Sequence, residues 1–218
     1  MMKKVLIFDF DGTLVDTVTD VGLCFNEALK QYGFPQHPLK NFDRFVGGNL
    51  ETVVSGMLPE RERTEENISK VKTLYRRLYL ASDKPHSKPY PGVEPMLFEL
   101  HRRGYRLAIN SNKGQTLLDS MVEALFPAGT FDSVVGYDEA RPSKPDPYGV
   151  DMICAQCGCT RRDAVYIGDG ESDLNTAKNA EIPFVYVTWG QGKLDIGTKG
   201  LFSVRSTRQL YEYLITLG

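Results

Sequence analysis

The chain is poor in the residues on which several common kinds of site depend. Its 218 residues include only 3 histidines, and His37, His86 and His101 lie singly in polar stretches. Neither a histidine metal cluster nor a clear histidine base is therefore visible. Acid and base chemistry, if the protein performs any, has to fall to carboxylates or lysine.

The chain also lacks an excess of one charge and any long hydrophobic run. The formal net charge is −2, which offers no broad basic surface and argues against nucleic acid as a partner. The apolar run near the N-terminus is only VLIF, shorter than a signal-peptide core and far shorter than a membrane span. We expect a cytoplasmic protein without a membrane partner. A small charged substrate remains compatible with this composition.

Cysteine is scarce, but three of the 4 cysteines are clustered. Cys154, Cys157 and Cys159 have a spacing like CxxCxC, which would suit a metal site. Zinc takes four ligands, however, and no fourth cysteine or histidine lies near them. The alternative is a set of reduced thiols at the end of a helix, and the sequence leaves their role undecided.

What the chain does have is the composition and pattern of a soluble α/β protein. Hydrophobic residues make up 41% and charged residues 25%. Short apolar runs, typical of buried strands, alternate with segments of helical periodicity. The expected strands are 4–8, 105–110, 133–135, 164–167 and 184–187. This alternation predicts a doubly wound parallel sheet, a Rossmann-like core with helices on both faces.

The stretch 16–86 interrupts this alternation. It contains no comparable strand run, and its apolar residues recur at helical spacing. The proline-rich segment 82–92 suits a hinge that returns the chain to the sheet. We therefore predict a core domain formed by 1–15 and 87–218, and an inserted helical domain formed by 16–86.

Two carboxylates follow the first predicted strand. Asp9 and Asp11 lie in FDFDGTLVDT, where the strand ends, and ligands of open α/β sheets collect at such carboxyl ends. Neighbouring carboxylates repel one another unless a cation or a division of protonation states compensates. Magnesium, which prefers oxygen ligands, fits such a pair. A pair of loop-capping residues is the simpler alternative.

Further polar residues follow the later strands. Ser111 and Asn112 come after YRLAIN, and Lys144 lies in RPSKPDP. Asp169 and Asp173 occur in GDGESD, after AVYI, where Asp173 could also be a helix N-cap. Each feature is weak alone, but all of them fall at the same end of the predicted sheet.

These segments together resemble the four motifs of the haloacid dehalogenase superfamily. The motifs are DFDGTLVDT, SNK at 111–113, the lone Lys144 before PDP, and GDGESD, and their order and strand placement also match. The resemblance covers essentially the whole chain, including a helical cap after the first motif. Within the superfamily, the chain is most similar to the phosphoglycolate phosphatase group.

The resemblance implies a magnesium-dependent hydrolase of a small phosphorylated metabolite. It implies that Asp9 attacks phosphorus and that Asp11 acts as acid and base, its backbone carbonyl also binding Mg²⁺. It assigns phosphate binding to Gly12, Ser111, Asn112 and Lys144, and metal binding to Asp9, Asp11, Asp169 and Asp173. Thr13 would add a polar contact.

The predicted cap is expected to choose the substrate by closing over the catalytic face. Its segment FVGGNL contains Gly47 and Gly48, which would let the backbone approach a ligand. A plain loop between helices is the alternative. The residues in this loop and in the middle of GDGESD differ from those of many phosphoglycolate phosphatases, so the sequence leaves the substrate open.

Other functions on the same motifs also stay open. A β-phosphoglucomutase-like phosphomutase, a pyrophosphatase or a nucleotidase would share them. Outside enzymes, response-regulator receivers combine aspartates, magnesium and a lysine, but they need no acid such as Asp11 and no insertion of this length. Asp11 also disfavours dehalogenation, which needs no acid for a halide leaving group. The oligomeric state is left open between monomer and homodimer.

Overall fold

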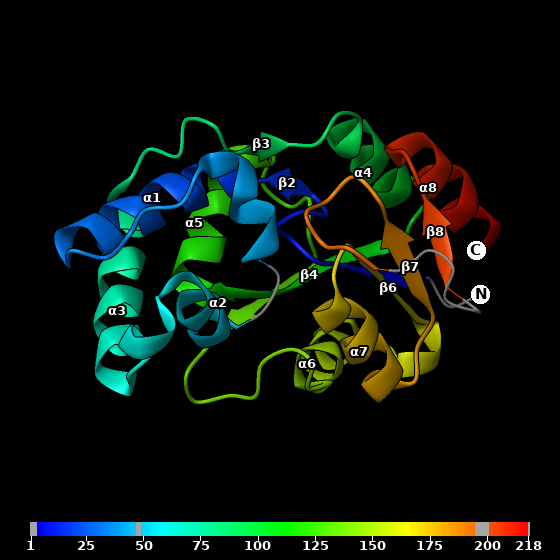
Figure 1. Cartoon of the computed structure of the whole chain (residues 1–218). Helices are drawn as coiled ribbons and strands as arrows, with labels where there is room; N and C mark the ends of the chain where they lie inside the picture. Colours follow the sequence, from blue (N-terminus) through cyan, green and yellow to red (C-terminus); the bar gives the residue numbers. More distant parts are fainter. Residues whose placement is uncertain (1–3, 47–48, 195–200, 218) are drawn as a thin grey trace.

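The structure, a computed structural model of the chain, describes residues 4–46, 49–194 and 201–217. Its centre is a parallel sheet of six strands in the order β5-β4-β1-β6-β7-β8 (Figure 1). The strands are β1 (Val5–Phe8), β4 (Arg106–Gly114), β5 (Ser133–Tyr137), β6 (Ala164–Gly168), β7 (Phe184–Val187) and β8 (Phe202–Val204). The strand order reverses beside β1, which lies between β4 and β6. Where the order of parallel strands reverses in this way, a crevice forms at the carboxyl end of the sheet.

Helices cover both faces of the sheet, which explains why strands such as β1, β6 and β7 are apolar along their whole length. The alternation of side chains in β1 sends Leu6 and Phe8 to one face and Val5 and Ile7 to the other. The first face packs against α4 (Val93–Arg102), α5 (Gln115–Leu125) and α8 (Thr207–Leu214). The second packs against α6 (Tyr148–Cys157) and α7 (Glu171–Ala180). The predicted doubly wound fold is confirmed.

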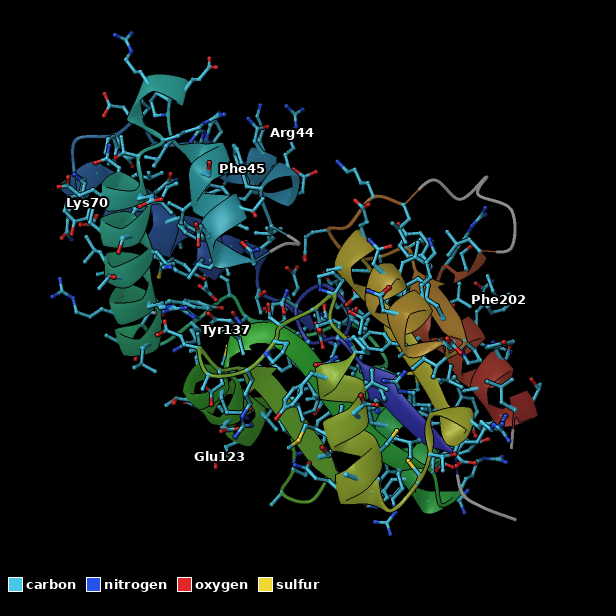
Figure 2. All side chains as sticks on the ribbon, turned by 90° about the horizontal axis from the view of Figure 1, so that it is seen from below. Arg44, Phe45, Lys70, Glu123, Tyr137 and Phe202 are labelled. Atoms are coloured by element: carbon cyan, nitrogen blue, oxygen red, sulfur yellow. The ribbon has the colours of Figure 1, made fainter. Side chains whose placement is uncertain are left out.

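In the sequence, a group of helices follows β1 and precedes the other strands of the sheet. It consists of α1 (Val18–Gln31), α2 (Leu50–Met57) and α3 (Glu65–Ala81), with the short 3₁₀ helices η1 (Leu39–Arg44) and η2 (Glu60–Glu62). We call residues 16–86 the helical insertion. Phe25 of α1 stacks on Tyr75 of α3 with ring centroids 3.7 Å apart, so these helices share apolar contacts of their own. In Figure 2, Arg44, Phe45 and Lys70 mark the insertion, and Phe202 lies at the far side of the sheet.

The two chain connections to the insertion pair with each other. β2 (Val15–Asp16) and β3 (Lys88–Pro89) form a short antiparallel ladder beside the sheet. The buried Asp20 carboxylate accepts hydrogen bonds from His86 N–H at 3.0 Å and from the Ser87 hydroxyl at 2.7 Å. These contacts hold the entry and exit of the insertion together.

Some elements differ from the prediction. β4 continues through Gly114, so Ser111 and Asn112 belong to the strand rather than to a loop after it. β8, β2 and β3 have no counterpart among the predicted strands because each is only two or three residues long. The short elements η3 (Arg161–Asp163) and η4 (Ile215–Leu217) complete the chain. Among the described helices, none combines the length and the apolar character that a membrane span requires.

Candidate active site

The carboxyl end of the sheet brings together most of the predicted site residues. Asp9 follows β1, and its N–H donates to the Ile167 carbonyl of β6 at 2.9 Å, which places the first motif beside the fourth. Oxygen atoms of Asp9, Asp169 and Asp173 all lie within 4.8 Å of one another, and all three residues are buried. Residues separated by about 160 positions in sequence thus form one acidic cluster.

Lys144 lies in the middle of this cluster. Its ammonium contacts Asp9 Oδ1 and Asp173 Oδ1, both at 2.7 Å, and its side chain is only 3% exposed. Burial alone would lower the pKa of Lys144, but the carboxylates of Asp173 and Asp9 raise it well above its usual value. The lysine is therefore a buried cation held by two anions, rather than a solubilising surface residue.

Asp173 has a double role in this arrangement. Helix α7 begins at Glu171, so Asp173 lies inside its first turn rather than at the N-cap, and its Oδ2 accepts a hydrogen bond from Gly170 N–H at 3.0 Å. Its other oxygen holds Lys144. Both oxygens of Asp173 are thus engaged, so its side chain positions the lysine and the start of α7.

Asp169 is fixed by the loop that follows Asp9 and by the loop that follows β7. Thr13 Oγ1 donates to its Oδ1 at 3.2 Å, and Gly192 N–H donates to its Oδ2 at 2.9 Å. Gly12 has a φ of +83°, and a Cβ there would collide with the Asp169 carboxylate and the Gln191 amide. Only glycine allows the first motif to approach Asp169 this closely.

Even with Lys144 beside them, the carboxylates of the acidic cluster are not all easily ionised. Burial and the neighbouring Asp173 raise the pKa of Asp169 to about 6. Burial, Asp173 and Asp169 also raise the pKa of Asp9 well above its usual value, although Lys144 opposes this. Buried carboxylates that repel one another would be stabilised by a further positive charge. Their oxygen atoms suit a hard divalent cation such as Mg²⁺.

The two aspartates of the first motif lie in different surroundings. Asp11 Oδ1 accepts a hydrogen bond from the Thr17 hydroxyl at 2.6 Å and contacts Lys113 Nζ at 3.1 Å. The side chain of Asp11 is 32% exposed, against 11% for Asp9. Its carboxylate is not part of the acidic cluster. The structure thus separates two residues that the sequence presents as equals.

Ser111 and Asn112 line the same cavity as Asp9. The Asn112 side chain bonds to both main-chain groups of Lys144: it accepts from N–H at 3.0 Å and donates to the carbonyl at 3.3 Å. Asn112 therefore anchors the lysine segment. Ser111 accepts a hydrogen bond from Lys113 N–H at 3.2 Å, which leaves its hydroxyl proton available to a ligand.

The site opens into a cavity of about 630 Å³ between the sheet and the helical insertion. The sheet side carries the acidic cluster, Asp11, Ser111 and Lys144. The insertion contributes apolar side chains and two cations. These insertion residues include Val18, Val21, Phe25, Lys72, Tyr75, Arg76 and Leu80. The volume is within the range of small-ligand sites.

The structure does not place two groups of predicted residues at the site. Gly47 and Gly48 lie outside the described residues. The three clustered cysteines are free thiols around the end of α6. In the part of the chain that the structure describes, the acidic cluster is the one group of three or more possible metal ligands, so the cysteines do not form such a group.

Some site residues were missed by sequence reasoning. Lys113 belongs to the quoted SNK motif but was assigned no role, although its buried ammonium pairs with Asp11 and lies 4.7 Å from the Tyr79 ring centroid. Burial lowers the pKa of Lys113, but Asp11 and Tyr79 raise it above its ordinary value. Gln191 and Gly192 follow the strand at 184–187, and their position after a buried strand is the signal that could have identified them.

Comparison with known proteins identifies the class to which this fold and site belong. The family model described as haloacid dehalogenase-like hydrolase matches residues 6–187, most of the chain. The chain belongs to the haloacid dehalogenase-like hydrolase family, as its motifs predicted.

The relatives place the chain more narrowly. A phosphoglycolate phosphatase of Aquifex aeolicus is 30% identical over 192 residues, covering 88% of each chain. One of Cereibacter sphaeroides is 29% identical over 203 residues, covering 91% of this chain and 92% of the relative. A crystal structure from Lactobacillus delbrueckii subsp. bulgaricus, classed provisionally as a phosphoglycolate phosphatase, has 28% identity and a TM-score of 0.90, covering 98% and 99% of the two chains. The chain is thus an enzyme, a phosphoric monoester hydrolase similar to phosphoglycolate phosphatases.

Proposed function

We propose that this phosphatase hydrolyses a small phosphate monoester with Mg²⁺, through a phosphoryl group carried transiently on Asp9. The observation that carries the proposal is the Lys144 bridge between Asp9 and Asp173, with Asp169 in the same cluster at the end of an open cavity. A buried carboxylate beside a fixed cation is suited to attack an anionic phosphate, because the cation offsets the charges of both.

Asp9 is the proposed nucleophile. Its carboxylate oxygen forms a bond to phosphorus while the bond from phosphorus to the leaving oxygen breaks. Lys144, whose geometry is fixed by Asp173 and by Asn112, offsets negative charge on the phosphoryl oxygens. Ser111 and main-chain N–H groups nearby are proposed donors to the same oxygens. Phosphoryl transfer depends mainly on such positioning and charge compensation.

Asp11 is the proposed acid and base. It gives a proton to the leaving oxygen in the first step, and in the second it takes a proton from water as the water attacks phosphorus and the bond to Asp9 breaks. Thr17 and Lys113 hold one oxygen of Asp11, so the other is available for these transfers. The partial exposure of Asp11 suits a residue that exchanges protons with substrate and water.

The residues present fit a magnesium ion. Asp9 and Asp169 are the proposed carboxylate ligands, with the main-chain carbonyl of Asp11, while Asp173 supports them by holding Lys144. Burial and repulsion from neighbouring carboxylates raise the pKa values of Asp9 and Asp169, so a further cation beside them would be favoured. When bound, Mg²⁺ would neutralise carboxylate and phosphate charge. Gly12, Thr13 and Gly192 orient Asp169 for that role.

The helical insertion is the proposed cap that selects the substrate. The residues proposed for the chemistry, Asp9, Asp11, Ser111, Lys144, Asp169 and Asp173, lie outside it, yet its own residues form the opposite wall of the cavity. An insertion closed over the site would exclude water while phosphate is transferred. The names of the relatives support a small phosphorylated metabolite, such as phosphoglycolate, as the substrate class.

The proposal is tested by incubating the purified chain with a panel of small phosphate esters, in Mg²⁺ and in excess chelator. Free phosphate should appear only with the divalent ion, and the variant Asp9→Asn should release none. Full activity in chelator would contradict the metal requirement. A phosphomutase would instead move the phosphoryl group to a sugar phosphate, which the release of free phosphate distinguishes.

A further inference from the structure

Helix α3 presents two cations to the side of the cavity that the phosphoryl chemistry does not use. Lys72 and Arg76 are four residues apart, so they lie on one face of the helix, and both line the cavity. Leu80 continues the same face. The sheet side already supplies Lys144 near Asp9, so these two cations are additional positive charges on the opposite wall of the cavity.

Neither cation is strongly engaged by the protein. Within the residues that the structure describes, Lys72 makes no ion pair and no side-chain hydrogen bond. Arg76 pairs with Glu139 at 2.8 Å, but the two side chains are 38% and 73% exposed. Ion pairs this exposed are weak, and a better-placed anion can displace one partner. Two cations on a cavity wall are thus available to a ligand.

Residues opposite α3 hold the Arg76 side chain in position at the cavity wall. Its guanidinium lies 5.6 Å from the ring centroid of Tyr137, at the end of β5, and Figure 2 shows Tyr137 between α3 and the sheet. Hydrogen bonding and charge from Arg76, with a further contribution from Lys72, lower the pKa of Glu139. Glu139 is therefore the anion with which Arg76 pairs at the cavity wall.

Other acidic residues do not neutralise this face. Asp138 also lines the cavity, but it lies 3.7 Å from Arg141 and accepts a hydrogen bond from Ala140 N–H at 2.9 Å. Glu51 lines the cavity from α2 and is exposed. No ion pair joins either acid to Lys72 or Arg76 among the described residues.

We propose that Lys72 and Arg76 form a subsite for an anionic group on the alcohol part of the substrate, with Glu139 as an internal competitor for Arg76. The inference rests on the proposed function and narrows its substrate class to phosphate esters that carry a second acid group. A neutral alcohol part would gain nothing from the two cations, whereas a carboxylate would form charge-assisted hydrogen bonds with both.

The test compares two substrates that differ only in the second group: 2-phosphoglycolate and its neutral amide. We expect Lys72→Gln and Arg76→Gln each to lower the ratio of kcat/KM for the carboxylate over the amide by about tenfold, mainly through KM for the carboxylate. Arg77→Gln, which changes an exposed cation on α3 that does not line the cavity, should leave the ratio unchanged.

Glu139→Gln gives the opposite test, because it removes the competitor. It should lower KM for 2-phosphoglycolate and leave KM for the amide unchanged. An unchanged ratio in the double variant Lys72→Gln/Arg76→Gln, with amide hydrolysis retained, would overturn the subsite and leave the proposed function standing. A wild-type protein that hydrolyses neither these esters nor p-nitrophenyl phosphate with Mg²⁺ would overturn both. Preference of the wild-type protein for the amide would also overturn the subsite.

Discussion

At the carboxyl end of the sheet, the charged side chains are buried and bonded to one another, whereas on the facing wall of the helical insertion they are exposed and weakly paired. Lys144 is 3% exposed and held by two carboxylates, while Arg76 is 38% exposed and pairs with a surface glutamate. The geometry of the first group is fixed by hydrogen bonds from β4 and from the loops that follow β1, β6 and β7. The second group can change partners.

This difference matches two different tasks. A group that stabilises charge during a reaction acts best when its position is set before the substrate arrives. A group that distinguishes one substrate from another has to give up its partner within the protein when the ligand binds. If that pair is weak and exposed, the exchange costs little free energy.

The largest effect is expected from Asp9→Asn. Without its nucleophile the protein cannot form a phosphoryl intermediate, so activity should fall by about 10⁵-fold or more with every substrate. Steady-state assays with p-nitrophenyl phosphate and with an alkyl phosphate measure this, and circular dichroism checks that the variant is folded. Retention of more than about one hundredth of the activity would assign the nucleophile elsewhere.

Lys144→Met should reduce stability as well as activity. Removing one partner of a buried ionic cluster leaves unpaired charge, so the free energy of unfolding should fall by about 4 kcal/mol at pH 8. The loss should be smaller at pH 5, where Asp9, whose folded pKa is raised, can take up a proton. Urea unfolding at both pH values tests this. Arg141→Met, an exposed cation in the same segment, is the control and should change little.

The acidic cluster should make the metal-free protein less stable as pH rises. The folded pKa of Asp169 is about 6, above the unfolded value of about 3.9, so its contribution is complete below about pH 4 and is lost as pH rises through 6. The free energy of unfolding should fall by about 3 kcal/mol over this range in chelator. Asp169→Asn should make that decline smaller, leaving the part that comes from Asp9, and Mg²⁺ should raise Tm more at pH 7.5 than at pH 4.5. A profile identical in the two proteins would contradict the cluster's electrostatics.

The smallest effect on the chemistry is expected from replacing residues 16–86 by a short linker. The remaining sheet should stay soluble and keep phosphatase activity, because the residues proposed for the chemistry lie outside the insertion, although the loss of the Thr17 hydrogen bond to Asp11 should make it slow. It should lose selectivity among substrates. Relative kcat/KM values across a panel of phosphate esters measure this. An unchanged ranking would show that selection resides in the sheet.

The sheet and its motifs could be predicted from the sequence because their signals are local. Apolar runs such as Val5–Phe8 mark buried strands, and polar residues at the ends of parallel strands must meet at one end of the sheet. On this basis the sequence predicts that Asp9, Lys144, Asp169 and Asp173 lie at one site, and in the structure they form one cluster. The assignment to the haloacid dehalogenase-like hydrolases is likewise confirmed by the family match.

What the sequence could not give is the pairing of side chains across the cavity. Nothing in the spacing of Asp9 and Asp11 shows that one faces a buried lysine and the other a threonine and Lys113. The contact between Arg76 and Glu139 joins residues 63 positions apart on separate elements. Short strands such as β2 and β3 were missed because two residues carry no periodicity.

Asp9 and Asp11 are proposed to divide the reaction between nucleophile and acid–base, and trapping the phosphoryl group on the protein distinguishes the two roles. In the Asp11→Asn variant, Asp9 should still attack an activated donor whose leaving group needs no proton, such as p-nitrophenyl phosphate. The phosphoryl group should then leave Asp9 slowly, because the attacking water has lost its base. Mass spectrometry of the acid-quenched variant, mixed with Mg²⁺ and this donor, should find an added phosphoryl group on the peptide that contains Asp9. A phosphoryl group on any other residue would contradict the account.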